Sequence, residues 1–520
     1  MKRFFKILGL ILIVMIIGLL LWFHSNLRDR NPGYQADLKI INGNLSPLNA
    51  GFAAFPITPE VPDLWTDKDG DAEYNPKDGD TFTDGNGNGV FDPVWLAGFG
   101  NSRAANGIHD DLWARTMVLD DGKTRLAIVA LDVIGFMSDD VIDVRIRIPG
   151  EAGVTYTIIT STHTHQGPDL MGLWGKSPFK SGINKKYLEY VKNQVVKSVV
   201  SAVKSMRPAR LAISEDLTGA IPLVSDTRKP EVFDSGLRLI RAIDIEKGNT
   251  LGSLIAWTDH PETLWSDNLL ITSDFPNYVR EGVEKGVSNG ESLVKPGIGG
   301  VAVYINGAVG GLMTTPPSLT VKDPFSDQEF MEPTFEKAEA QGKQLALLVL
   351  NSMDKPVEEV DVAGISIIVR TITLPLGNIK FKLGTMFGIF DRGTTGWMKM
   401  RSELSVFRIG PLSFATLPGE VYPEIINGGI EAPEGRDFNI ETVEVPSVRE
   451  MMSGKYKFIF CLANDEIGYI IPKSQWDVKA PFAYETKDSP YGEENSLGPE
   501  TAPLLHKNIK EMLTELNQSE

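Results

Sequence analysis

The chain has 520 residues, 42% of them hydrophobic, so it is long enough to bury a large core. Its formal net charge of −17 argues against nucleic-acid binding and against docking on anionic lipid through a basic patch. A single cysteine, Cys461, excludes an intramolecular disulfide and a zinc site made of several thiolates.

The N-terminus predicts a membrane helix. Three of the first six residues are basic, and residues 7–23 are almost entirely apolar. With Phe4 and Phe5 this stretch has about the 20 apolar residues that a bilayer-spanning helix needs. No small-residue cleavage site follows, and Trp22 suits the membrane interface. We expect an uncleaved signal anchor over residues 1–24 with the rest of the chain outside the cytoplasm; a cleaved signal peptide is the alternative.

Residues 25–50 are expected to form a tether, and an unusual loop follows at residues 63–92, rich in Asp, Asn and Gly. Within it Asp84, Asn86, Asn88 and Asp92 place oxygen side chains mostly at alternate positions on a flexible backbone. Calcium loops need this arrangement, although the bidentate glutamate of an EF-hand is missing. The loop therefore predicts a structural Ca²⁺ site, with a solvated acidic loop as the alternative.

The remainder interleaves predicted strands and helices without a repeat. Helices are expected at residues 187–203, 275–285, 333–353 and 501–516. Strands are expected at residues 125–132, 237–245, 251–257, 300–305, 360–376, 405–409, 412–417 and 456–462. This order predicts an α/β fold with mixed β-sheets flanked by helices, in a single large catalytic domain spanning residues 51–520.

Polar side chains follow several of these strands. His163 and His165 follow a β-rich run, and side chains two residues apart in an extended chain point to the same side. Both could reach one metal ion, or one could bind while the other handles a proton; two solvated polar residues are the alternative. With His260 and Glu420, also at predicted strand ends, zinc would gain nitrogen and oxygen ligands. The residues alone predict a metal hydrolase without a defined substrate.

Several blocks resemble, in family order, the N-terminal catalytic domain of the neutral/alkaline non-lysosomal ceramidases. The matching blocks are GF at 51–52 with PITP at 56–59, residues 112–115 and 127–132, THTHQGP at 162–168, His260, LPGE at 417–420, NDEIGY at 464–469, and YE at 484–485. The resemblance implies zinc held by His163, His260, Glu420 and Tyr469. It also implies that His165 lies against the bound water or the substrate carbonyl, and that Arg228 contacts substrate.

The family's active-site serine block corresponds to residues 306–312, with Gly307 at the place of the serine. Asn306 and Gly307 are accordingly expected to bind substrate. The expected function is a membrane-anchored, zinc-dependent hydrolase that cleaves an amide bond in an N-acyl sphingoid lipid or a related small molecule. Two alternatives remain: a zinc esterase or cell-envelope hydrolase of different substrate, and a non-catalytic, calcium-stabilised surface binding protein.

Overall fold

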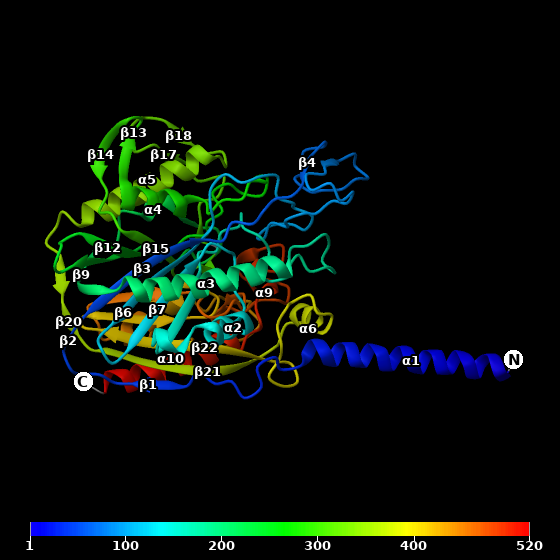
Figure 1. Cartoon of the computed structure of the whole chain (residues 1–520). Helices are drawn as coiled ribbons and strands as arrows, with labels where there is room; N and C mark the ends of the chain where they lie inside the picture. The colour runs from blue at the N-terminus through cyan, green and yellow to red at the C-terminus, as the bar shows by residue number, and fades with distance from the viewer. Residues whose placement is uncertain (1, 312, 519–520) are drawn as a thin grey trace.

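A computed structural model describes residues 2–311 and 313–518 of the chain. Leu312, the last residue of the 306–312 block, lies outside the described residues. Within them, two large β-sheets pack face to face, and helices cover their outer faces (Figure 1). The expected α/β fold with mixed sheets flanked by helices is confirmed.

The larger sheet has the strand order β15-β12-β11-β9-β3-β6-β7-β8, and β19 also pairs with β9. Its strands are β3 (Asn49–Pro56), β6 (Trp113–Asp120), β7 (Arg125–Leu131), β8 (Tyr156–Ser161), β9 (Arg207–Asp216), β11 (Leu237–Asp244), β12 (Thr250–Trp257), β15 (Val301–Asn306) and β19 (Glu358–Val360). The pairs β7–β8 and β12–β15 are parallel, so the carboxyl ends of each pair lie at one edge of the sheet.

The second sheet has the order β1-β21-β22-β23-β25. Its strands are β1 (Leu38–Ile40), β21 (Ile365–Pro375), β22 (Lys399–Ile409), β23 (Leu412–Thr416) and β25 (Tyr456–Phe460). β23 and β25 are parallel, and backbone bonds from Ser161 and Asn464 join this sheet to the end of β8.

The core between the sheets follows from the period-two pattern of the strands. Along β7, Leu126 and Ile128 face the inter-sheet core, whereas Ala127 and Val129 face the helices. Because both faces are buried, such strands are continuously apolar and their ends carry the polar residues. This pattern concentrates functional side chains at the sheet edge.

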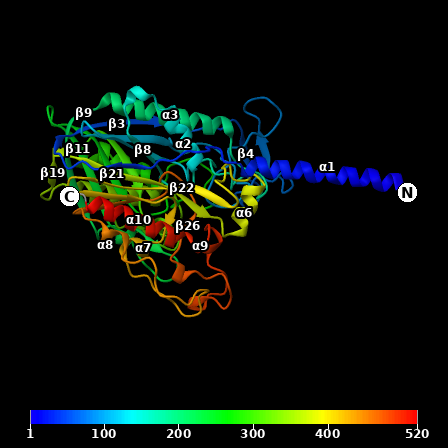
Figure 2. The same cartoon turned by 90° about the horizontal axis from the view of Figure 1, so that it is seen from below.

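Helices cover both outer faces. α2 (Ser138–Arg147) and α3 (Lys185–Ser205) pack on one half of the larger sheet, and α4 (Phe275–Lys285) and α5 (Phe335–Ser352) pack on the other. α10 (Thr501–Asn517) covers the second sheet (Figure 2). The side chain of Asn184 caps α3 by accepting bonds from two backbone N–H groups of its first turn.

Shorter elements fill the connections. They are the pairs β2 (Ser46–Pro47) with β20 (Val362–Ala363), β4 (Leu64–Thr66) with β5 (Thr81–Thr83), β10 (Ser225–Asp226) with β16 (Met313–Thr314), β13 (Gly286–Asn289) with β14 (Ser292–Pro296), β17 (Val321–Lys322) with β18 (Glu329–Phe330), and β24 (Glu420–Val421) with β26 (Tyr469–Ile470). The short helices are α6 (Ile379–Met386), α7 (Pro423–Asn427), α8 (Val448–Met451) and α9 (Tyr491–Glu494).

The N-terminal helix α1 (Lys2–Leu27) leaves the body as a rod (Figures 1 and 2). By length and composition alone, this helix could cross a membrane. None of its apolar stretch is buried against the body. The expected tether at residues 25–50 differs from the structure, because β1 pairs with β21 and β3 begins at Asn49. A three-residue edge strand carries too little periodicity to be recognised in the sequence.

Candidate metal centre

Four segments from both sheets meet at one edge of the body. His163 follows β8 and His260 follows β12, whereas Glu420 and Tyr469 follow β23 and β25. The parallel pair β24–β26 places Glu420 directly beside Tyr469. All four side chains are buried. His163 lies beyond the strand in a left-handed conformation (φ 72°), so a turn rather than strand periodicity orients its ring.

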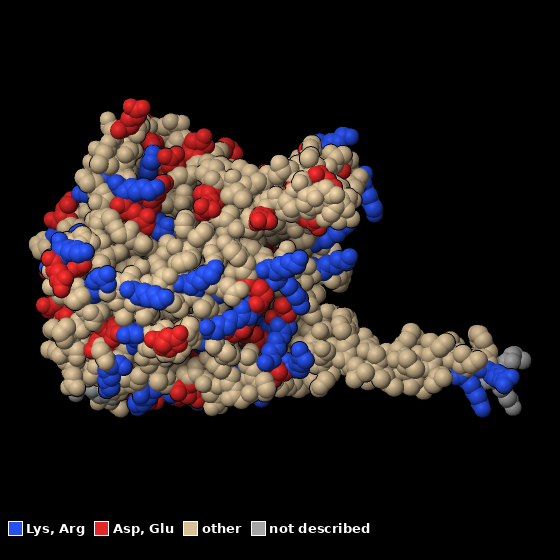
Figure 3. Space-filling model, viewed as in Figure 1, with Lys and Arg blue, Asp and Glu red and all other residues tan. Residues whose placement is uncertain are grey.

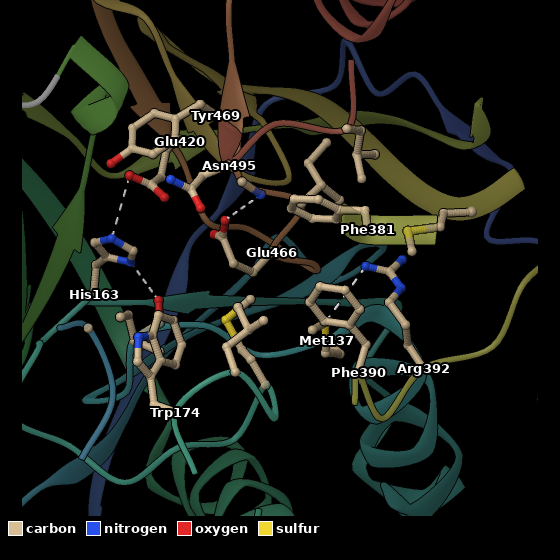
Figure 4. A pocket seen from close by; sticks show the side chains of 18 of the residues that line it. Met137, His163, Trp174, Phe381, Phe390, Arg392, Glu420, Glu466, Tyr469 and Asn495 are labelled. Atoms are coloured by element: carbon tan, nitrogen blue, oxygen red, sulfur yellow. Dashed lines mark hydrogen bonds and ion pairs between the residues drawn. The ribbon is translucent and has the colours of Figure 1, made fainter. Parts of the chain in front are cut away.

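The two histidines turn toward one carboxylate oxygen. Nε2 of His260 lies 3.0 Å from Oε2 of Glu420, and Nε2 of His163 lies 3.6 Å from the same atom. The hydroxyl of Tyr469 also hydrogen-bonds Glu420. Figure 4 shows the ring of His163 pointing at Glu420 with Tyr469 alongside.

The other ring nitrogens fix the tautomers. Nδ1 of His163 lies 2.6 Å from the carbonyl oxygen of Ile134, and Nδ1 of His260 lies 2.7 Å from that of Met313. Because a carbonyl oxygen only accepts, each Nδ1 donates, and in the neutral rings each Nε2 presents a lone pair. Two imidazole lone pairs and a carboxylate oxygen that converge in this way are ligands that one metal ion can bind. The set therefore fits a metal ion.

The ionisation of the cluster agrees with this geometry. Burial lowers the pKa of His163 to about 3, although the nearby negative charge of Glu420 acts to raise it. Burial also acts to lower the pKa of His260, but the hydrogen bond to Glu420 and the charges of Glu262 and Glu420 outweigh it and raise the pKa to about 9. The raised pKa of His260 favours a proton on the bond to Glu420, and a bound metal ion would take the place of that proton.

His165 lies beside these groups with a free nitrogen. Its ring centroid is 5.0 Å from that of His163, and a ligand nitrogen of each of His163, His165 and His260 lies within 4.8 Å of the others. Nε2 of His165 is buried and has no hydrogen-bond partner among the described residues. Nδ1 lies 3.0 Å from Oε2 of Glu262, a residue that the sequence reasoning missed. An acid two positions after a candidate ligand is the signal that could have found it.

An apolar pocket of about 80 Å³ adjoins the cluster (Figure 4). His163, His165, Glu420 and Tyr469 form its polar side. Its apolar side is formed by Ile134, Met137, Met171, Leu173, Trp174, Phe381 and Phe390. The site can therefore hold a molecule with a polar group at the cluster and an apolar chain beyond it.

Glu466 also lines this pocket, and the sequence reasoning gave it no role. Its Oε1 accepts a bond from the backbone of Gly468, whereas its buried Oε2 has no partner among the described residues. Burial and the charge of Glu420 raise its pKa well above the usual range. The raised pKa favours the protonated form of Glu466, in which Oε2 can donate a hydrogen bond.

Arg228 lies outside the cluster. Its guanidinium forms two bonds to Glu424, of 2.9 and 2.6 Å, and lies 4.1 Å from the ring centre of Tyr422. It lines a neighbouring pocket that shares Tyr491 with the apolar pocket. The structure thus places Arg228 one side chain away from the candidate site.

Asn306 and Gly307 do not line the apolar pocket. The side-chain amide of Asn306 donates to the carbonyl oxygens of Thr162 and Asp259, at 3.1 and 2.7 Å, and so ties two site strands together. A Cβ at Gly307 would lie 2.2 Å from Oγ1 of Thr258. A serine would therefore not fit at position 307 without a shift of its neighbours.

The expected calcium residues lie together in an exposed turn of the loop that protrudes beside β4 (Figure 1). The carboxylate of Asp84 accepts backbone bonds of 2.6 and 2.7 Å from the glycines at 87 and 89. The amides of Asn86 and Asn88 donate to one oxygen of Asp92 at 2.8 and 2.6 Å. The four side chains thus hydrogen-bond within the loop itself.

Comparison with known proteins relates the chain to one group of enzymes, although no protein-family model matches it. It is 27% identical over 222 residues to the neutral ceramidase of Mycobacterium tuberculosis, a stretch covering 38% of this chain and only 34% of that relative. The crystal structure of the neutral ceramidase from Pseudomonas aeruginosa matches with a TM-score of 0.62 and 16% identity, over 91% of this chain and 75% of that one. A structure described as a ceramidase complexed with C2 matches with a TM-score of 0.62 and 15% identity, over 91% and 76% of the two chains. The expected resemblance to the neutral ceramidases is confirmed: the chain is similar to them in part of its sequence and in its fold.

Proposed function

We propose that the protein is a zinc-dependent hydrolase that cleaves the amide bond of an N-acyl lipid. The observation that carries this proposal is the convergence of His163, His260 and Tyr469 on the carboxylate of Glu420, beside an apolar pocket. The relatives named above are ceramidases, which supports an amide of a lipid as the substrate.

Zinc suits the donor set better than calcium does. Imidazole nitrogens favour zinc, whereas calcium takes oxygen ligands almost exclusively. His163, His260, Glu420 and Tyr469 would hold the ion. A bound zinc supplies a Lewis acid for the carbonyl oxygen and a water of lowered pKa.

The chain's own residues supply the proton transfer. Nδ1 of His165 lies 3.0 Å from Oε2 of Glu262, and its buried Nε2 has no hydrogen-bond partner among the described residues. This nitrogen can accept a proton from the attacking water and return it to the leaving amine nitrogen. Glu466, as a neutral acid, can donate to an oxygen atom of the substrate in the pocket.

The other expectations are proposals of the same kind. We propose that α1 anchors the body outside the cytoplasm and that Asp84, Asn86, Asn88 and Asp92 bind calcium. Arg228 is proposed to contact the polar part of the substrate from the neighbouring pocket, across Tyr491.

Metal content and amide hydrolysis test the proposal together. The full chain is purified, its zinc is measured, and an N-acyl amide is compared with the ester of the same acyl chain. We expect zinc in the wild type, and loss of both zinc and hydrolysis in His163→Ala. His109→Ala, on an exposed histidine outside the cluster, is the matched control and should keep both. Turnover of the ester alone would favour the esterase, and a wild type without zinc or hydrolysis would favour the surface binding protein.

A further inference from the structure

The segment that forms part of the pocket's apolar wall also carries an exposed apolar surface. Phe381 of α6 and Phe390 of the following loop line the pocket. On the outside of the same segment Ile379, Leu383 and Phe387 are exposed, and they recur every four residues. This spacing places side chains on one face of a helix. One short segment thus separates the candidate site from an apolar patch.

Two further aromatic side chains are exposed on neighbouring segments. Trp397 is 76% exposed, and Phe179 is 86% exposed in a segment that touches the loop after α6. The contact is made at Gly172, where a Cβ would lie 2.1 Å from the carbonyl oxygen of Ile389. We call Phe179, Ile379, Leu383, Phe387 and Trp397 the interfacial surface.

The body end of α1 packs against this segment (Figure 1). The ring of Phe387 lies 5.7 Å from that of Trp22 and 5.4 Å from that of Phe23. Nδ2 of Asn26 donates to the carbonyl oxygen of Met386 at 2.8 Å. The membrane helix and the pocket wall therefore form one packed unit.

These contacts fix the depth at which the interfacial surface would lie in a bilayer. If α1 spans the hydrocarbon region, Trp22 at its body end lies at the membrane interface, where tryptophan is enriched. Phe387 touches Trp22 and therefore lies at the same depth. An apolar surface continuous with a membrane helix is stabilised by burial in lipid rather than by exposure to water.

Charge along this edge agrees with a lipid partner. The chain as a whole is acidic, with a net charge of −17. Nevertheless Lys176, Lys180 and Lys399 are exposed on the segments that carry the interfacial surface, as is Lys380, which pairs with Glu494 at 2.6 Å. Figure 3 shows Lys and Arg side chains gathered on the side of the body from which α1 emerges. Lysines around an apolar patch attract anionic lipid headgroups.

We propose that the interfacial surface inserts into the bilayer that α1 spans, so that the pocket opens into lipid and takes its acyl chain directly from that membrane. The cavity of about 80 Å³ is smaller than the roughly 300 Å³ or more of typical ligand sites, so its walls part when a chain enters. Phe381 and Phe390 are the wall residues on the membrane side. The choice of substrate rests on the proposed function; insertion of the surface does not.

The first test measures insertion without catalysis. The full chain is reconstituted in vesicles of phosphatidylcholine and phosphatidylglycerol whose acyl chains carry bromine at defined depths. A fluorophore is attached to Ile379→Cys or, as the matched control, to Leu293→Cys in β14; the native Cys461 is buried and does not react. Bromine near the headgroups should roughly halve the emission of the label at 379 and leave the label at 293 unchanged. Equal quenching at both positions, or none at 379, would overturn the proposal.

The second test separates insertion from chemistry. The double variant Ile379→Ser, Leu383→Ser is compared with Leu293→Ser on a long-chain N-acyl amide in the same vesicles and on a short-chain, water-soluble amide. We expect kcat/KM for the vesicle substrate to fall by about tenfold or more, through KM, with the soluble substrate unaffected. Equal losses on both substrates, or no loss on either, would contradict lipid entry. Quenching at 379 in a wild type that cleaves neither amide would refute the proposed function and leave the insertion standing.

Discussion

Zinc binding should displace the proton that His260 shares with Glu420, and the affinity for zinc should therefore depend steeply on pH. A histidine ligand must be deprotonated before it binds a metal. Because the pKa of His260 is raised to about 9, each pH unit below that value weakens binding about tenfold. Between pH 9 and pH 7 the expected loss is on the order of 100-fold, or about 3 kcal/mol. His163, with its pKa lowered to about 3, is already neutral and adds nothing above pH 5.

The same proton affects the metal-free protein in the opposite direction. The folded pKa of His260 lies above its unfolded value of 6.5, so its pair with Glu420 stabilises the fold fully below about pH 6.5. That contribution is lost as the pH rises through about 9. Raising the pH therefore weakens the metal-free fold while it strengthens zinc binding.

Competition with a chromophoric chelator at several pH values measures the affinity, and calorimetry in buffers of different ionisation enthalpy counts the protons released. We expect about one proton per ion from His260. A second proton that is released by the wild type but not by Tyr469→Phe would identify Tyr469 as a phenolate ligand. His109→Ala should give the same slope. An affinity that does not change with pH, together with no proton release, would refute the assignment of His260 as a ligand that is protonated in the metal-free protein.

Three substitutions test other parts of the site. Glu262→Gln should keep zinc bound but lower kcat by about 10-fold to 100-fold, because it removes the negative charge beside Nδ1 of His165; loss of zinc with kcat per bound ion intact would contradict this role. Glu420→Gln, which keeps the size of the side chain, should reduce the zinc retained after gel filtration to background, and full retention would remove Glu420 from the ligand set. Gly307→Ser should lower the free energy of unfolding by about 1 to 3 kcal/mol because its Cβ meets a buried neighbour, whereas Gly43→Ser, in open space, should not; equal thermal stability of both variants would show that position 307 has room.

Periodicity in the sequence predicted the elements that have clear faces. The helix expected at residues 275–285 has the bounds of α4, and the strands expected at 237–245 and 251–257 match β11 and β12 to within one residue at one end. β22 begins at Lys399, although a strand was expected only from residue 405. The first half of the strand was missed because it contains buried polar residues, which hide the apolar pattern of a strand. Glu403, for example, is buried because Arg145 of α2 pairs with it at 2.8 Å. A pair between residues so far apart in the chain cannot be predicted from the local sequence pattern.

The candidate site likewise contains residues that the sequence predicted and contacts that it did not. Strand ends pointed to His163, His260 and Glu420, and the order of the family blocks pointed to Tyr469; the structure brings the four together. The period-two argument for His163 does not describe its turn, where φ is 72°. The bond between Arg228 and Glu424 depends on packing between distant segments, and no local spacing indicated it.

Anomalous diffraction recorded on both sides of the zinc absorption edge tests the central claim most directly. We predict one peak at about 2.0 to 2.2 Å from Nε2 of His163, Nε2 of His260 and a carboxylate oxygen of Glu420. The peak should be absent in crystals of His163→Ala. Zinc-soaked crystals of the wild type with no peak among these three side chains, or with the zinc bound elsewhere, would contradict the account.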